Sequence, residues 1–258
     1  MAHIPRKRFG QHFLSHPNII HHLVRAIDPR PDDRLVEIGP GLGALTEPLL
    51  QHARHLTVIE LDRDLVAHWR AHPQAGRLTV VEGDALAFDF SALGDNLRLV
   101  GNLPYNISTP LLFHLASFSP QMRDAHFMLQ KEVVDRMVAE PATRDYGRLS
   151  VMLQYLFHMD ALMDVPPEAF TPPPKVMSSV VRLIPKVPAE RQAHDESRFA
   201  FLVLQAFSQR RKMLRSTLKG HVPEAVFAKL GIDPARRAET LTLEEFVGLS
   251  NESPGDAG

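Results

Sequence analysis

The chain of 258 residues contains no cysteine, so it can form neither a disulfide bond nor a thiolate metal site. Hydrophobic residues make up 44% of the sequence, but no uninterrupted apolar run is long enough to span a bilayer. The basic residues Arg6, Lys7 and Arg8 precede a mixed stretch that lacks the apolar core of a secretory signal. Sequence repeats and low-complexity segments are absent as well. These absences favour a cytoplasmic globular protein without a membrane partner.

A strong excess of charge is also missing, since the formal net charge is −1. The charges are nevertheless segregated. Lys/Arg and Asp/Glu number five and one in residues 1–31, thirteen and nineteen in 32–185, and eight and three in 186–220. Basic ends beside an acidic middle are typical of a protein with a phosphate-facing surface and a separate small-molecule site, although solvated helix faces produce the same pattern. Charge alone leaves both interpretations open.

A glycine loop lies between a strand pattern and a helix pattern near the N-terminus. Residues 34–38 predict a buried strand, Gly39 and Gly41 belong to the loop that follows, and residues 44–54 have helical periodicity. Glycines let the backbone turn tightly and approach a ligand closely. The spacing also satisfies a loose dinucleotide fingerprint, so the loop alone is compatible with an NAD-dependent oxidoreductase.

Three further strand patterns each lead to a polar residue: residues 55–59 to Glu60, 78–81 to Asp84, and 97–101 to Asn102. Glu60 lies about twenty residues beyond the glycines, where a carboxylate can hold both hydroxyls of a ribose. A dinucleotide enzyme does not need the second acid, Asp84, whereas a cofactor with an adenine amino group and a cationic tail can use it. Glu37, two residues before the loop, adds negative charge near such a tail.

Residues 102–105, Asn-Leu-Pro-Tyr, have the composition of a nucleobase site. The Asn102 carboxamide and the Leu103 carbonyl can both accept hydrogen bonds from one exocyclic amino group. Pro104 keeps Leu103 out of the helical region, so this carbonyl is available, and Tyr105 can stack on the base. A four-residue match also occurs in ordinary turns, and the cofactor-binding pattern upstream is what favours the functional interpretation.

The order of these motifs resembles that of the S-adenosylmethionine-dependent rRNA adenine N6,N6-dimethyltransferases, and most closely the small-subunit (16S) rRNA enzymes. The likeness runs from about Arg6 to about Leu249 and includes six segments, residues 7–14, 36–43, 58–62, 83–85, 102–105 and 170–176. It implies a Rossmann-like α/β fold with a seven-stranded sheet. It also implies dimethylation of two adjacent adenosines in a hairpin loop near the 3′ end of 16S rRNA during ribosome biogenesis. We expect the substrate to be a partly assembled small subunit and the enzyme to be a monomer.

The resemblance further implies a role for each site residue. The residues expected to bind S-adenosylmethionine are His12, Leu14, Gly39, Gly41, Glu60, Asp84 and Asn102. The residues expected to act on the target adenine are Asn102, Leu103, Tyr105 and Phe170, with Phe170 as a second stacking face beside Tyr105. Family members commonly have Asn where this chain has His12, and an imidazole reproduces only part of the contacts of an amide.

Two domains are expected. The strand and helix alternation predicts a doubly wound α/β methyltransferase domain over residues 1–185, and the helical period that follows predicts an all-helical RNA-binding domain over residues 186–251. Residues 252–258 are expected to be a disordered tail. Thr242 and Glu245 have the spacing of a capping box before the last helix. The residues predicted to bind RNA phosphates are Arg6, Lys7, Arg8, Arg210, Arg211, Lys212 and Arg215.

Other functions are compatible with parts of the sequence. An oxidoreductase would share the glycine loop and Glu60, and a noncatalytic RNA-binding or assembly factor would share the surface features. His68 and His72 have the i, i+4 spacing of two metal ligands, but no suitable third ligand lies near them, and no metal is expected.

Large-subunit rRNA and DNA adenine are alternative substrates of related enzymes. Leu103, where the DNA enzymes have proline, and the helical C-terminal region favour small-subunit RNA.

Overall fold

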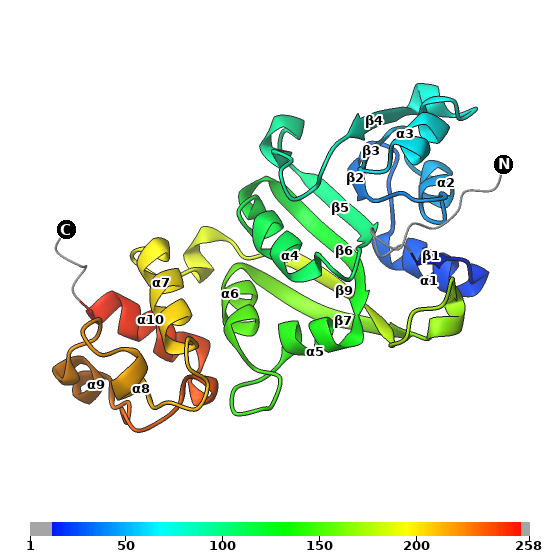
Figure 1. The fold of residues 1–258 in the computed structure, drawn as a ribbon. Helices are drawn as coiled ribbons and strands as arrows, with labels where there is room; N and C mark the ends of the chain where they lie inside the picture. Colours follow the sequence, from blue (N-terminus) through cyan, green and yellow to red (C-terminus); the bar gives the residue numbers. More distant parts are fainter. Residues whose placement is uncertain (1–11, 254–258) are drawn as a thin grey trace. The chain divides into compact units, whose positions relative to one another are not determined.

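A computed structural model describes residues 12–253, and its main sheet is mixed and seven-stranded (Figure 1). The strands are β2 (Arg34–Ile38), β3 (Leu56–Glu60), β4 (Leu78–Glu82), β5 (Leu97–Asn102), β6 (Met122–Gln130), β7 (Phe157–Val165) and β9 (Ser178–Pro185). Their order across the sheet is β4-β3-β2-β5-β6-β9-β7. Strands β2 to β6 run parallel, and β9 runs antiparallel to β6. The predicted doubly wound α/β fold is confirmed.

The α-helices that precede β7 in the chain are α1 (Pro17–Ile27), α2 (Thr46–Leu50), α3 (Arg63–Arg70), α4 (Ser108–Ala116), α5 (Lys131–Val138) and α6 (Arg148–Leu156). Helix α2 is shorter than the predicted helix over residues 44–54. Its later start is explained by Gly41 and Gly43, whose φ angles of 55° and 93° keep the chain in a turn just before the helix. Helix α3 begins sharply because the Asp62 carboxylate accepts the N–H of Asp64 at 3.0 Å.

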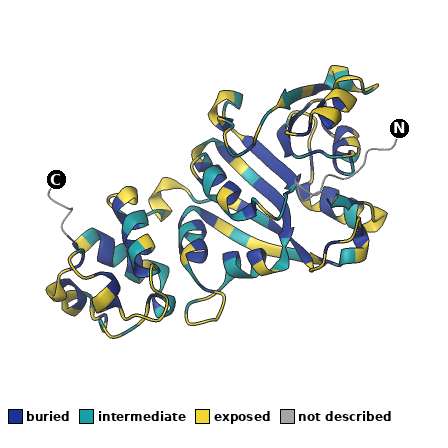
Figure 2. Ribbon diagram, viewed as in Figure 1, coloured by how far each residue is buried: buried dark blue, intermediate teal, exposed yellow. Residues whose placement is uncertain are grey.

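Strand β5 is buried from Leu97 to Gly101 (Figure 2). A parallel strand in the middle of a doubly wound sheet is covered on both faces, and from Leu97 to Gly101 the sequence of β5 is therefore apolar apart from Arg98 rather than alternating. The core around the sheet includes Leu35, Leu56, Trp69 and Met128. This rigid core holds the strand ends in place.

The carboxyl ends of the four parallel strands β2 to β5 meet at one edge of the sheet. The register pairs Glu37 with Val58 and Val100, and it pairs Glu60 with Glu82. In open α/β sheets, ligands bind beyond this edge. The strand order therefore gathers the polar strand ends that the sequence predicted as a site.

The chain divides into two compact units, one with residues up to Val134 and Met159–Pro185, the other with Asp135–His158 and Lys186 onwards. The second unit therefore includes residues 135–158, which the sequence analysis placed in the first domain. Helix α6 explains the difference, because Val151 and Tyr155 belong to the same apolar cluster as Phe199. The helical period of residues 149–157 shows that one face of α6 is apolar, but it does not show which surface that face covers.

The other helices of the second unit are α7 (Glu196–Ala206), α8 (Leu214–Thr217), α9 (Glu224–Leu230) and α10 (Leu243–Glu252). The predicted capping box is confirmed: the Thr242 hydroxyl accepts the N–H of Glu245 at 3.2 Å, and the Glu245 carboxylate accepts the N–H of Thr242 at 2.8 Å. The predicted tail over residues 252–258 begins inside α10, where Glu252 pairs with Lys229. Residues 254–258 lie outside the described part of the chain.

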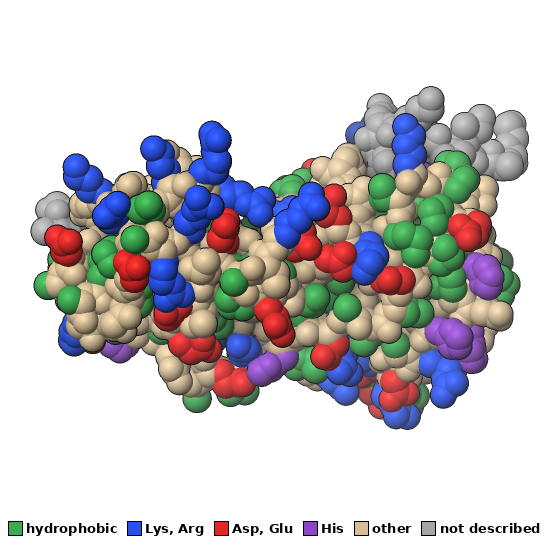
Figure 3. Space-filling view, turned by 90° about the horizontal axis from the view of Figure 1, so that it is seen from below, with side chains coloured by type: hydrophobic (Ala, Val, Ile, Leu, Met, Phe, Trp, Pro, Cys, Tyr) green, Lys and Arg blue, Asp and Glu red, His purple; other side chains and the backbone are tan. Residues whose placement is uncertain are grey.

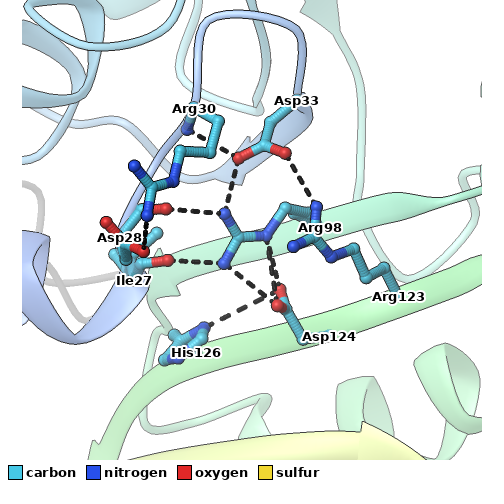
Figure 4. Close-up of polar contacts among 8 residues, drawn as sticks. All are labelled: Ile27, Asp28, Arg30, Asp33, Arg98, Arg123, Asp124 and His126. Atoms are coloured by element: carbon cyan, nitrogen blue, oxygen red, sulfur yellow. Dashed lines mark hydrogen bonds and ion pairs between the residues drawn. The ribbon is translucent and has the colours of Figure 1, made fainter.

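A buried ion network lies at the other end of β5 (Figure 4). The Arg98 side chain is 5% exposed and donates to Asp33 at 2.6 Å and to Asp124 at 3.0 Å. It also donates to the backbone carbonyls of Ile27 and Asp28. Two carboxylates and two carbonyls satisfy the guanidinium, which joins the end of α1 and the following turn to β5 and β6.

Replacing Arg98 by lysine is expected to lower the free energy of unfolding by about 2 kcal/mol, because one ammonium group cannot reach all four acceptors. Urea denaturation at pH 7 would measure the loss. The control is Arg123→Lys, which changes a 48%-exposed arginine that also pairs with Asp33. This control should lose less than about 1 kcal/mol, and equal losses in the two variants would contradict the role given to Arg98.

Candidate active site

The polar strand ends line one cavity of about 330 Å³, a volume within the range of small-molecule sites, about 300–1,000 Å³. All residues predicted to bind the cofactor line it: His12, Leu14, Gly39, Gly41, Glu60, Asp84 and Asn102. Leu103 and Tyr105 also line it, whereas Phe170 does not. Except for Phe170, the structure thus brings together all residues predicted for the cofactor and the target adenine. They come from four strand ends and the N-terminal segment.

The glycine loop comes very close to the N-terminal segment. Gly41 has a φ of 55°, and a Cβ atom at this position would lie 2.9 Å from the ring of Phe13. Both the backbone conformation and the available space therefore require glycine here. The N–H of Gly39 donates to the Ile59 carbonyl at 2.9 Å, which anchors the start of the loop to the end of β3.

Glu60 is the last residue of β3 and is 7% exposed. Its carboxylate accepts the N–H of Asp62 at 2.9 Å and that of Gly41 at 3.4 Å. Burial raises the pKa of Glu60, and these backbone donors oppose the increase. The two N–H groups hold the carboxylate against the glycine loop, and its remaining lone pairs can accept from a ribose diol.

Glu37 is a second buried acid in the cavity wall, and it is only 2% exposed. Its carboxyl group accepts a hydrogen bond from the Thr46 hydroxyl at 2.7 Å. Burial, together with the nearby Glu60 charge, raises the pKa of Glu37 from 4.5 to about 8. The group is therefore mostly protonated at pH 7, and a cation beside it would favour ionisation.

Asp84 lies just beyond β4 on the exposed side of the cavity. Its carboxylate accepts the N–H of Leu86 at 2.9 Å, which fixes the side chain in the turn. The second carboxylate oxygen can accept from an amino group, as the predicted contact with the cofactor adenine requires.

Asn102 ends β5, and its side-chain N–H donates to the His12 carbonyl at 2.8 Å. Because a carbonyl can only accept, this bond sets the orientation of the carboxamide and leaves Oδ1 as an acceptor. The N–H of Leu103 donates to the Met128 carbonyl at 3.0 Å, which holds the next peptide on β6. The amide that was predicted to hold a base is thus oriented in advance.

The Tyr105 ring is stacked on the His12 imidazole, with ring centroids 5.5 Å apart and planes at 26°. The imidazole is anchored by a hydrogen bond from Nδ1 to the Pro172 carbonyl at 2.8 Å. The Tyr105 hydroxyl is hydrogen-bonded to the Ser178 hydroxyl, and burial raises the pKa of Tyr105. His12 therefore covers one of the two faces on which a base could stack.

Two serines support this turn, a role that the sequence alone did not predict for either of them. Ser108 was expected to cap a helix, but its hydroxyl makes no cap hydrogen bond. Ser108 donates to the carbonyls of Pro104 at 3.2 Å and Tyr105 at 3.0 Å, and Ser178 holds the Tyr105 hydroxyl. A serine four residues after Pro104 is a usable local signal. Ser178 has no such signal, since it lies far along the chain on β9.

Phe170 is 2% exposed and packs in the core together with Leu14. The reason is a small sheet in which β1 (Phe13–Leu14) pairs antiparallel with β8 (Phe170–Thr171), with Leu14 opposite Phe170. The predicted second stacking face is therefore not formed in this structure. A stacking role for Phe170 stays a prediction that requires the side chain to leave the core.

The predicted RNA-binding residues of the second unit are exposed. Arg210, Arg211 and Lys212 follow α7, and Arg215 lies in α8. Arg210 is 3.5 Å from the Glu239 carboxylate and donates to the Arg144 carbonyl at 2.7 Å. Figure 3 shows Lys and Arg side chains in a row along one edge of this unit. Arg6, Lys7 and Arg8 lie outside the described residues.

Other kinds of site find no support in residues 12–253. This part of the chain holds no group of three or more His, Cys, Asp or Glu residues able to bind a metal. His72 lies 3.6 Å from the Glu47 carboxylate. Within the same residues, no helix has the length and apolar character needed to cross a membrane.

The family profile described as ribosomal RNA adenine dimethylase matches residues 2–253. The chain belongs to this family. The ribosomal RNA small subunit methyltransferase A of Laribacter hongkongensis is 62% identical to this ribosomal RNA adenine dimethylase over 251 residues, which cover 96% of each chain. The protein of the same name from Thiobacillus denitrificans is 60% identical over 248 residues, covering 96% of this chain and 97% of the relative.

Two solved structures resemble the dimethylase over nearly its whole length. A dimethyladenosine transferase from Plasmodium falciparum has a TM-score of 0.79 at 28% identity and covers 92% of this chain and 96% of its own. The 23S rRNA methyltransferase ErmE has a TM-score of 0.71 at 26% identity, with 92% and 98% covered. The predicted family is confirmed, and the oxidoreductase alternative is therefore wrong.

A ribosomal RNA adenine dimethylase uses S-adenosylmethionine as its methyl donor, and the cavity suits this cofactor. The Glu60 carboxylate offers acceptors for a ribose, and at Gly39, where a Cβ atom would meet nothing within 4 Å, the bare backbone leaves room for a ligand. Glu37 provides an ionisable carboxyl group for a cation. The residues that line the cavity therefore suit a molecule with a ribose, an adenine and a positively charged tail.

Proposed function

We propose that the chain is the small-subunit enzyme of its family. It transfers methyl groups from S-adenosylmethionine to N6 of two adjacent adenosines in a hairpin loop near the 3′ end of 16S rRNA, giving N6,N6-dimethyladenosine during small-subunit biogenesis. Relatives named small-subunit methyltransferases, 58–62% identical over nearly the full length, support this substrate. The observation that carries the chemistry is the Asn102 carboxamide, oriented by the His12 carbonyl in the cavity wall.

S-Adenosylmethionine supplies a methyl group that is electrophilic because it is bonded to a sulfonium. The residues of this chain bind and orient. Glu60 holds the ribose, Asp84 the adenine, and the backbone at Gly39 and Gly41 forms the floor. His12 and Leu14 close the cavity from the N-terminal side, and both line it in this structure.

Asn102 and Leu103 activate the adenine by orienting it. The lone pair of N6 is delocalised into the adenine ring, which makes this nitrogen a poor nucleophile. Hydrogen bonds from N6 to Asn102 Oδ1 and to the Leu103 carbonyl favour a pyramidal nitrogen whose lone pair is available. The proton leaves after the nitrogen has become cationic, so no strong general base is needed.

The same two acceptors allow a second methylation. After the first transfer, N6 keeps one N–H, which can still bond to Asn102 or to the Leu103 carbonyl. Bringing the base into the cavity requires unstacking it, which costs a few kcal/mol and is easiest in a single-stranded loop. Stacking on Tyr105 offsets this cost, and His12 must move if the base uses the face that the imidazole covers.

The working substrate is a partly assembled small subunit, and the enzyme acts as a monomer in the cytoplasm. A net charge of −1 provides little general attraction to naked RNA, so the shape of the particle must help to position the loop. The exposed residues Arg210, Arg211, Lys212 and Arg215 contact RNA phosphates.

Neutralising Arg210, Arg211, Lys212 and Arg215 together is expected to weaken RNA binding and to reduce the slope of log K against log salt by about 3, because fewer counterions are released. Fluorescence anisotropy with a labelled 16S hairpin at several salt concentrations would measure this. The control neutralises four basic residues that are paired with acids. Arg30, Arg54 and Lys229 are exposed, and Arg182 is partly buried. An unchanged slope in the first variant would place the RNA elsewhere.

The proposed reaction is tested by its product. The enzyme would be incubated with S-adenosylmethionine and, separately, with small subunits lacking the modification, large subunits and duplex DNA. Each sample would then be digested to nucleosides for mass spectrometry. Dimethyladenosine in the small-subunit sample alone is expected. Methylated adenine in DNA, or modification of the large subunit alone, would refute the substrate, and no product at all would favour a noncatalytic assembly factor.

A further inference from the structure

Trp69 is the single tryptophan of the chain, and it is fully buried in α3. Its indole N–H donates to the Gly41 carbonyl at 3.0 Å. Gly41 lines the cofactor cavity, whereas Trp69 does not. The indole therefore contacts the glycine loop from the side away from the cavity.

Both backbone polar groups of Gly41 are held by side chains, the N–H by Glu60 and the carbonyl by Trp69. In a planar trans peptide, the N–H of the following residue points opposite to the carbonyl. Since the Gly41 carbonyl points to the buried indole, the N–H of Leu42 points away from it. Leu42 is one of the residues that line the cavity, and an N–H that points away from the indole can donate to a ligand there.

The indole also determines the shape of the loop. A Cβ atom at Gly43, where φ is 93°, would lie 2.7 Å from the Trp69 ring. The ring and the loop thus fit only because residue 43 has no side chain. The N-cap of helix α3 is Asp62, whose N–H donates to Glu60 at 2.9 Å. Helix α3 and its N-cap therefore hold both Glu60, the acid expected to bind the ribose, and the glycine loop.

We propose that Trp69 is a positioning residue for the cofactor: through the Gly41 carbonyl it turns the Leu42 N–H towards the cavity, and it strengthens cofactor binding without touching the ligand. The inference rests on the proposed role of the glycine loop in binding S-adenosylmethionine. A leucine or phenylalanine could fill the core at this position, but neither could donate to Gly41.

Trp69→Phe tests the hydrogen bond, because a smaller aromatic ring is kept in the core and the N–H donor is lost. Calorimetry with S-adenosylmethionine should show a Kd about five-fold higher than that of the wild type, the usual consequence of losing one net hydrogen bond. The KM for S-adenosylmethionine should rise by the same factor, with kcat at saturation unchanged. Trp69→Leu, which also removes the ring from Gly43, should raise Kd about ten-fold or more.

Ile27→Val is the matched control, because Ile27 belongs to the same core cluster and does not line the cavity. It should lower the melting temperature and leave Kd unchanged. The single indole also gives one N–H resonance in the ¹⁵N-labelled protein, and this resonance should shift when S-adenosylmethionine is added.

If Trp69→Phe binds as tightly as the wild type, the positioning role is wrong while the proposed function stands. A wild-type chain that fails to bind S-adenosylmethionine would instead refute the proposed cofactor site, and the inference with it. Should Trp69→Leu fail to fold, the comparison of Trp69→Phe with Ile27→Val still decides the question.

Discussion

Replacing Asn102 by alanine is expected to lower kcat about 10²–10³-fold, the usual effect of removing one preorganised polar group that acts on the reacting atom. The variant loses the acceptor that the His12 carbonyl holds in place. Most of the affinity for S-adenosylmethionine should remain, because Glu60 and Asp84 are untouched. Single-turnover methylation of unmodified small subunits would measure the rate, and calorimetry would measure the affinity.

Asn18→Ala provides the control for Asn102. Asn18 has the same side chain, lies in α1, is exposed and does not line the cavity. Its loss should change kcat less than about three-fold, because an exposed amide donates to water as readily as to a ligand. A near-normal rate in Asn102→Ala, or equal losses in the two variants, would show that Asn102 does not act on N6.

Replacing Glu37 by glutamine is expected to make stability less sensitive to pH. Burial raises the pKa of Glu37 from 4.5 to about 8. Below pH 4.5 the carboxyl group is protonated in both the folded and the unfolded chain, so its titration does not lower the free energy of unfolding there. As the pH rises towards 8, the unfolded chain releases the proton while the folded chain keeps it, so the wild type loses stability. At pH 7 this loss is about 3 kcal/mol, and the glutamine variant avoids it.

Urea denaturation at pH 5 and pH 7.5 would measure the effect, and the free-energy difference between Glu37→Gln and wild type should grow between these values. Glu47→Gln is the control, since Glu47 lies in α2 with a side chain that is 58% exposed. This control should follow the wild type at both pH values. A difference that does not change with pH would mean that Glu37 is ionised in the free protein.

Binding of S-adenosylmethionine should release the proton of the Glu37 carboxyl group, which calorimetry can detect. If a cationic ligand drives Glu37 to ionise, wild-type binding of S-adenosylmethionine at pH 7 releases up to one proton. The binding enthalpy should then depend on the ionisation enthalpy of the buffer. In Glu37→Gln this dependence should nearly vanish and the affinity should fall.

The cofactor half of the site was predictable because its signals are local. A strand pattern followed by Gly39 and Gly41 can be recognised within ten residues of sequence. Both glycines have positive φ angles in the structure, as a tight loop requires. Glu60, Asp84 and Asn102 each follow a strand, and parallel strands place their carboxyl ends at one edge. Their convergence on one cavity therefore needed only the α/β alternation.

The adenine half was less predictable, because it depends on contacts between distant segments. Phe170 is in the core because β8 pairs with β1, about 156 residues earlier in the chain. Such a two-residue pairing is too short to produce a periodicity of its own. The stacking of His12 on Tyr105 follows from the same pairing, and it decides which face of Tyr105 is covered.

The sequence by itself determined which site residues stand at the ends of strands, the family and the helical character of the C-terminal region, since each depends on residue types at fixed local spacing. Only the tertiary structure decided that residues 135–158 join the second unit, that Arg98 holds two carboxylates and that Trp69 supports Gly41. In all three cases the periodicity shows that a face is apolar or that a charge is present. The partner is chosen by packing between elements, which no local pattern records.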